Sequence, residues 1–144
     1  MVTSAWHRVG TSLPTLLADA LHKAGHNEEA LSVAQEALAL RDRHREPVFE
    51  AELYRLEAEL LVMAPGRAKA CEDSFRRAIE TAICQGARLL ELRAALGLNR
   101  LLQRLGRNEE VARLLAPVCR AYPEDPDAAD LHEAKTILAR TARP

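Results

Sequence analysis

A short motif that occurs twice constrains the fold of this chain more than any other feature. The sequence G-H-N-E-E-A begins at Gly25, and G-R-N-E-E-V begins at Gly106. A weaker copy, G-R-A-K-A-C, begins at Gly66, so the three glycines are 41 and 40 residues apart. A period of this length is typical of helical repeats that stack on their neighbours. Function should therefore be sought on the surface that the stacked units build.

The residues around each glycine predict two helices. Small or apolar residues follow each glycine at spacings of four and three, which places them on one stripe of a helix. These nine positions are Ala30, Ala34, Ala37, Cys71, Phe75, Ala78, Val111, Leu115 and Val118. The segments before the glycines have apolar residues at the same spacings: Leu13, Leu16, Leu17, Leu21, Leu53, Leu56, Leu60, Met63, Leu98, Leu101, Leu102 and Leu105. Each unit is thus predicted to be a helix, a turn and a second helix.

The motif itself combines a helix stop with a helix start. Gly25 and Gly106 can adopt the left-handed conformation that ends a helix. Asn27 and Asn108 are predicted to cap the second helix, and the glutamates that follow them suit its positive N-terminus. In the middle unit, Pro65 breaks the helix instead.

These observations predict one all-α domain over residues 1–144. Abundant alanine and leucine favour helices over sheets, and a composition of 48% hydrophobic and 28% charged residues fits a folded chain. We expect an α-α superhelix of three hairpins, over about 12–45, 48–86 and 88–121. An amphipathic helix over about 127–142 should cap the last hairpin, after two prolines in residues 121–127.

The pattern resembles the tetratricopeptide repeat (TPR). That family places a small residue in the first helix, a glycine turn, and small residues at two positions of the second helix. Ala18, Ala58 and Asn99 occupy the first-helix position here. Asn99 departs from the pattern, as does the lack of an early aromatic residue. The period of 40–41 exceeds the usual 34, which implies longer helices.

The resemblance extends to the C-terminal helical region of bacterial signalling proteins over roughly residues 12–140. Those proteins join an AAA-type ATPase module, often with a class III adenylate cyclase or a LuxR-type regulator domain, to TPR arrays. It is carried by four runs: LADALHKAGHNEEALSVAQEALAL, EAELYRLEAELL, CEDSFRRAIETAICQGARLLELRAALGLNRLL and DLHEAKTILA. It implies a non-catalytic scaffold that binds a protein or peptide. The chain has no P-loop and no cyclase aspartates, so we expect no enzymatic activity.

The first helices should line a concave groove, by analogy with the same family. Arg93, Gly97, Arg100 and Arg104 follow one stripe opposite the leucines, bordered by Gln103. The corresponding residues of the earlier helices are Glu52, Arg55, Glu59, Thr15, Asp19 and His22. We expect an acidic peptide or a C-terminal carboxylate to bind the arginines. The alternative is a solvated arginine face that pairs locally with Glu91 and its neighbours.

Two other functions remain open. One is self-association, for example as a homodimer, at an N-terminal edge near Trp6. The other is nucleic-acid binding, since residues 67–120 contain 11 Lys/Arg against 6 Asp/Glu, a net +5. The arginines concerned are Arg76, Arg77, Arg88, Arg93, Arg100, Arg104 and Arg107. Few aromatic residues and an overall pI near 6.5 make this second function less favoured.

No pattern predicts a catalytic residue, a metal site or a cofactor. His22 and His26 are four residues apart, but Gly25 interrupts the helix that would align them. Cys71, Cys84 and Cys119 are expected to be buried free thiols in a reducing compartment. The absence of a signal-like segment and of a membrane-length apolar run predicts a cytoplasmic protein.

Overall fold

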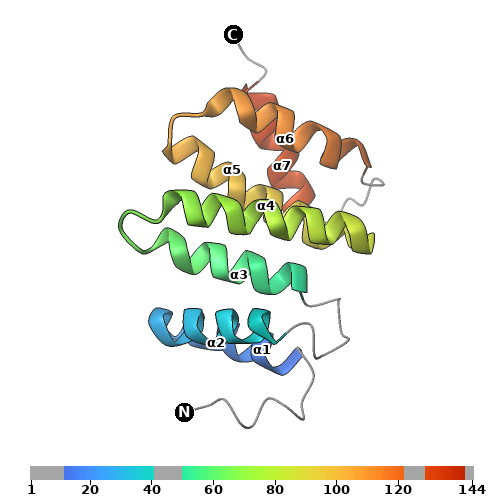
Figure 1. Cartoon of the computed structure of the whole chain (residues 1–144). Coiled ribbons are helices and arrows are strands. Elements are labelled where there is room, and N and C mark those ends of the chain that lie inside the picture. The colour runs from blue at the N-terminus through green and yellow to red at the C-terminus, as the bar shows by residue number, and fades with distance from the viewer. Residues whose placement is uncertain (1–11, 41–49, 122–128, 142–144) are drawn as a thin grey trace.

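The computed structural model describes residues 12–40, 50–121 and 129–141, and these ranges are helical apart from short turns (Figure 1). The predicted all-α class is confirmed. Trp6, the predicted connection over Arg43–Pro47 and the prolines in residues 122–127 lie outside the described residues. The helices of the described ranges are α1 (Ser12–Lys23), α2 (Asn27–Ala39), α3 (Glu50–Val62), α4 (Ala68–Gln85), α5 (Arg88–Arg104), α6 (Asn108–Ala121) and α7 (Ala129–Thr141).

The helices follow one another through the molecule in chain order (Figure 1). Each odd-numbered helix contacts the next odd-numbered one, from α1 to α3, α5 and α7. Each of α2, α4 and α6 packs on the two odd-numbered helices that flank it in sequence. The odd-numbered helices therefore run as a continuous series. None of the helices in the described ranges combines the length and the apolarity needed to cross a membrane.

The glycine turns form as predicted. Gly25 has a φ angle of 85° and Gly106 one of 74°, both in the left-handed region. In both turns the amide after the glycine donates a 2.9 Å hydrogen bond to the carbonyl five residues earlier. This bond satisfies a carbonyl that the helix end would leave unpaired.

The predicted capping roles of Asn27 and Asn108 are wrong, because each of them is the first residue of its helix and not the residue before it. The helix α2 begins at Asn27 itself, and His26 is the N-cap residue, without a side-chain capping bond. The Asn27 Oδ1 atom lies 3.0 Å from His22 Nδ1 instead. The acidic pairs do occupy the first turns of α2 and α6, as expected. Charge near the helix N-terminus, rather than a capping side chain, thus favours the start of α2.

The stripe of the second helices is confirmed by burial. All nine of its residues, from Ala30 to Val118, are at most 5% exposed. Ala18, Ala58 and Asn99, which occupy equivalent positions of the first helices, are also buried. Small residues at these positions let neighbouring helices approach closely.

Three apolar residues predicted to join the core are exposed instead. Leu16, Met63 and Leu105 are 63%, 64% and 45% exposed. Met63 and Leu105 follow the last residues of α3 and α5, so the turn carries them beyond the packed part of the helix. Leu16 lies on α1, at the N-terminal end of the helix series.

Gly97 does not belong to an exposed stripe. The ring of Phe75, on α4, fills the space beside it, and a Cβ atom at Gly97 would lie 2.3 Å from Phe75 Cε1. Thr15 was also expected on the groove face, yet it is only 5% exposed. Helical spacing places residues on a face of their own helix but does not say which neighbour covers that face.

The cysteines differ in their surroundings. Cys71 is buried, and its thiol donates a 3.2 Å hydrogen bond to the Ala58 carbonyl. Burial raises the pKa of Cys71 to about 11. Cys119 is partly buried and Cys84 is exposed, so the expectation of three buried thiols is wrong for Cys84.

Candidate partner-binding face

Four of the predicted partner-binding residues come together on one face. Arg55 and Glu59 of α3 and Arg93 and Arg100 of α5 line a cavity of about 200 Å³. Asp130 of α7 also lines it. We call this surface the α3–α5–α7 face. It is defined by Glu52, Arg55, Glu59, Arg93, Arg100, Gln103, Asp130 and Glu133, and Arg104 borders it at the C-terminal end of α5.

The α3 part of the face is a preorganised acidic cluster. Arg55 donates hydrogen bonds to both oxygens of Glu52, at 2.9 and 2.6 Å, and a further one to Glu59. Its side chain is only 14% exposed. Burial by itself would lower the pKa of Arg55, but Glu52 and Glu59 outweigh burial and raise that pKa above its ordinary value. Two carboxylates around one guanidinium leave a net negative charge here.

The α5 part of the face binds carboxylates of α7. Arg93 Nε lies 3.1 Å from Asp130 Oδ2, and Arg100 Nη2 lies 3.0 Å from Glu133 Oε1. The two acidic residues are three apart on α7, so they lie on one side of that helix. The arginines thus pair with a distant segment, and not with Glu91 as the alternative reading had it.

Gln103 and Arg104 are exposed and have no hydrogen bond or ion pair among the described residues. Gln103 lines a second cavity, between α5 and α7. Arg104 is at the end of α5. These two side chains are consequently available for contact with another molecule.

The predicted binding residues on α1 do not lie together with those on α3 and α5. Asp19 binds Lys23, and His22 bonds with Asn27, so both interact within the first hairpin. Neither lines the cavity that joins α3, α5 and α7. The cavity therefore brings together only the predicted residues of the later helices.

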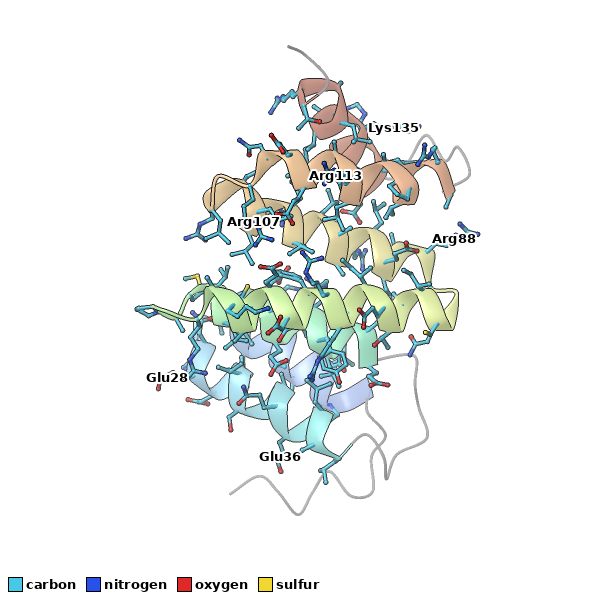
Figure 2. All side chains as sticks on the ribbon, turned by 45° about the horizontal axis from the view of Figure 1, so that its top comes forward. Glu28, Glu36, Arg88, Arg107, Arg113 and Lys135 are labelled. Carbon is cyan, nitrogen blue, oxygen red and sulfur yellow. The ribbon has the colours of Figure 1, made fainter. Side chains whose placement is uncertain are left out.

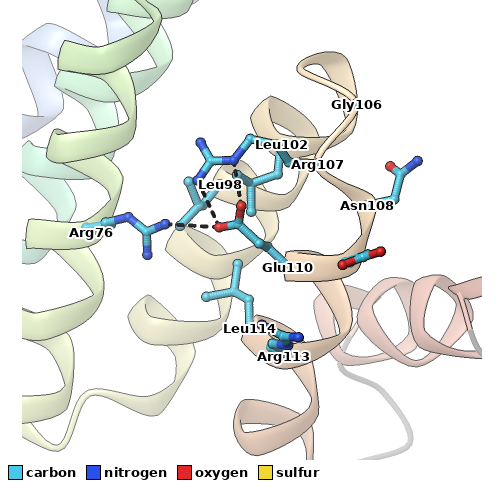
Figure 3. Close-up of a pocket in the computed structure, with 10 residues that line it drawn as sticks. Arg76, Leu98, Leu102, Gly106, Arg107, Asn108, Glu110, Arg113 and Leu114 are labelled. Carbon is cyan, nitrogen blue, oxygen red and sulfur yellow. Dashed lines mark hydrogen bonds and ion pairs between the residues drawn. The ribbon is translucent and has the colours of Figure 1, made fainter.

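A further cluster ties α4 to the start of α6. Arg107, in the turn between α5 and α6, donates hydrogen bonds to Glu72 at 2.7 Å and to Glu110 at 2.6 Å. Arg76 binds Glu72 at 2.7 Å and lies 3.6 Å from Glu110. Figure 3 shows Glu110 between the two arginines, beside a cavity of about 720 Å³. Because these charges neutralise one another, the cluster is a packing contact rather than a free basic site.

Sequence reasoning missed the α7 carboxylates and the consequence of Asn99. In the sequence, Asp130 and Glu133 were recognisable only as polar residues of an amphipathic capping helix. The sequence did not show which surface they would face. Asn99 was visible as a polar residue at a small-residue position. Its burial without a partner appears only in the structure.

Among the residues that the structure describes, no three histidine, cysteine, aspartate or glutamate side chains are grouped closely enough to hold a metal ion. Comparison of the chain with protein-family models finds no match, and comparison with curated proteins finds none either.

Proposed function

We propose that this chain is a non-catalytic, TPR-like scaffold that binds an acidic segment of a partner protein at the α5 end of the α3–α5–α7 face, where Gln103 and Arg104 lie, and not at the acidic α3 part. Three features support the TPR-like arrangement. The hairpins repeat every 40–41 residues, they turn at left-handed glycines, and successive odd-numbered helices pack side by side. A series of first helices in contact is the geometry that presents one long surface to a ligand.

The observation that carries the proposal is the docking of α7. Arg93 and Arg100 already hold two carboxylates that a helix presents three residues apart. The same stretch of α5 continues to Gln103 and Arg104, which have no ion pair among the described residues. An acidic partner segment would thus extend, at Gln103 and Arg104, the pairing of arginines with carboxylates that Arg93 and Arg100 already make with α7.

Nucleic-acid binding receives less support from the same geometry. Of the seven arginines that suggested it, Arg76 and Arg107 bind Glu72, while Arg93 and Arg100 bind α7. Arg88 donates a hydrogen bond to the carbonyl at the end of α6. Arginines held by protein groups are not free to neutralise phosphates.

Arg104 offers the cleanest test. Reversing the charge of Arg93 or Arg100 would place like charges against α7, whereas Arg104→Glu disturbs no ion pair within the described ranges. We expect Arg104→Glu to weaken binding of a fluorescein-labelled oligoglutamate peptide about tenfold, or about 1.4 kcal/mol. Fluorescence anisotropy would measure the affinity, and circular dichroism would confirm unchanged helix content.

The matched control is Arg113→Glu. Arg113 is an exposed arginine on α6, also without an ion pair in the described part of the chain (Figure 2). The Arg113→Glu substitution makes the same change in charge, but at a position outside the α3–α5–α7 face. Equal losses of affinity in the two variants would mean that only net charge matters, and the proposed face would be abandoned. The same pair can then serve in affinity capture of partners from the cell of origin.

A second candidate is self-association, and one observation favours it. Leu16 is 63% exposed on α1, the helix that begins the described series. An apolar side chain there could pack on another copy of the chain. The wider assignments to a bacterial signalling protein and to the cytoplasm rest on the sequence and stay predictions.

A further inference from the structure

Asn99 breaks a rule that the rest of the repeat obeys. It is 1% exposed, and neither its Oδ1 nor its Nδ2 atom has a hydrogen-bond partner. The equivalent residues of the other hairpins, Ala18 and Ala58, are apolar and fully buried. A buried amide without partners destabilises the folded state, and alanine would avoid that cost. Violations of this kind are expected at functional sites.

The place of Asn99 suggests what the amide is for. It lines a cavity of about 470 Å³ between α5 and α7. The other polar residues of that cavity are Arg100, Gln103, His132, Glu133, Thr136, Arg140 and Thr141, and Glu133 is paired with Arg100. Gln103 and Arg140 have no hydrogen bond or ion pair to any described residue. The cavity thus combines an unsatisfied amide with an unpaired cation.

The chemistry of the amide narrows the choice of ligand. Asparagine offers a donor and an acceptor side by side. A carboxylate would satisfy only the donor and an ammonium group only the acceptor, whereas a peptide main chain supplies both a carbonyl and an N–H. Both polar atoms of Asn99 are enclosed, so the amide must turn toward the cavity to reach a ligand, and the broad terminal torsion of asparagine permits that turn.

We propose that the cavity between α5 and α7 is a subsite for the main chain of an extended, acidic peptide. Asn99 binds a peptide unit through both of its polar atoms, and Arg140 binds an acidic side chain of the same segment. This inference rests on the proposed function, because it places one part of the partner segment at the α5–α7 side of the face.

The test uses N-acetyl-Ala-Glu-Ala-amide as the probe. In nitrogen–proton correlation spectra of the full chain, the side-chain amide signal of Asn99 is assigned by its loss in Asn99→Ala. We expect the probe to shift this signal in a saturable way, and Asn99→Ala to weaken probe binding about tenfold. Sodium acetate at the same concentration should shift the signal less than the probe does, because a carboxylate satisfies only the donor of the amide.

Two variants separate recognition from folding. Asn99→Ala should raise Tm by a few degrees while it weakens binding, which a purely structural asparagine would not do. Arg140→Ala should weaken binding of the acidic probe about threefold and leave N-acetyl-Ala-Gln-Ala-amide unaffected. An Asn99 signal that is unmoved by the probe, or moved equally by acetate, would overturn the subsite.

The outcome is distinguishable from failure of the proposed function. If Arg104→Glu weakens oligoglutamate binding but Asn99 does not respond to the probe, the face binds acidic segments without this subsite. If Asn99 responds and Arg104→Glu has no effect, the subsite stands and the wider face is rejected.

Discussion

Glu72 is the most buried carboxylate among the described residues. It is 7% exposed and accepts hydrogen bonds from Arg107, at 2.7 Å, and from Arg76. These bonds, with that of Arg107 the largest effect, outweigh burial and hold the pKa of Glu72 below its usual value of 4.5. A carboxylate with a lowered folded-state pKa stabilises the fold above its unfolded pKa, and this contribution disappears as the pH falls through the folded value.

We therefore predict that Glu72→Gln lowers the free energy of unfolding at pH 7 by about 1–2 kcal/mol. Both arginines are partly exposed, and Arg107 keeps Glu110, so the loss is modest. The difference from the unmodified protein should shrink as the pH falls from about 5 to about 3. Urea unfolding over this range measures it.

The control is Glu80→Gln, on the exposed side of the same helix. It should change stability by less than about 0.5 kcal/mol at any of these pH values. A Glu72 effect that stays constant with pH would contradict an electrostatic origin.

Individual residues show how far spacing can predict burial. The nine stripe positions were predictable because each is fixed by its distance from a glycine turn. Gly97 and Thr15 were misplaced because their exposure depends on what packs opposite. Gly97 is covered because the ring of Phe75, on another helix, packs against it.

Among the elements, α7 has a double role. The sequence predicted that it covers the third hairpin, and it does contact both α5 and α6. Only Leu131 and Ala134 of α7 are buried, against nine residues of α5. Ion pairs to Arg93 and Arg100 supplement this small apolar contact.

A double-mutant cycle can measure how much such an ion pair contributes to stability. Because Arg100 and Glu133 are 59% and 41% exposed, we predict a coupling of about 0.2–1 kcal/mol between Arg100→Ala and Glu133→Ala. It should decrease in molar salt, which screens exposed charges. Chemical unfolding of the two single variants and the double variant provides the values.

The corresponding cycle with Arg113→Ala in place of Arg100→Ala should show no coupling, since no ion pair links Arg113 to Glu133 among the described residues. Coupling of equal size in both cycles would argue that α7 is held by general charge and not by specific pairs. Loss of the specific pairs would also weaken the main observation behind the proposed face.

At the scale of the whole molecule, the two ends of the described helix series differ in the surface that they present. The α7 end is covered by an amphipathic helix with mixed charge, while α1 presents Leu16. Self-association through α1 predicts an average mass that rises with concentration in multi-angle light scattering. Leu16→Gln should return the mass to that of one chain, because it removes the exposed apolar contact.

Gln103→Glu is the comparison variant for this experiment, because it changes an exposed residue of α5 and leaves α1 intact. A mass that stays at one chain over the whole concentration range would eliminate self-association. A rise that persists in Leu16→Gln would place the contact elsewhere.

The sequence alone determined the helical class, the three glycine-centred hairpins and the buried stripes. These features depend on turn chemistry and on spacings of three and four residues, which are local properties of the chain. It also suggested an arginine-rich surface on α5.

Only the tertiary structure decided which polar groups meet. Arg93 and Arg100 bind carboxylates 37 and 33 residues away, and Asn99 is enclosed by packing that leaves its amide without a partner. Spacing within one helix specifies a direction around its axis. What lies in that direction depends on how separate helices pack, and this follows from the sum of many weak contacts across the chain.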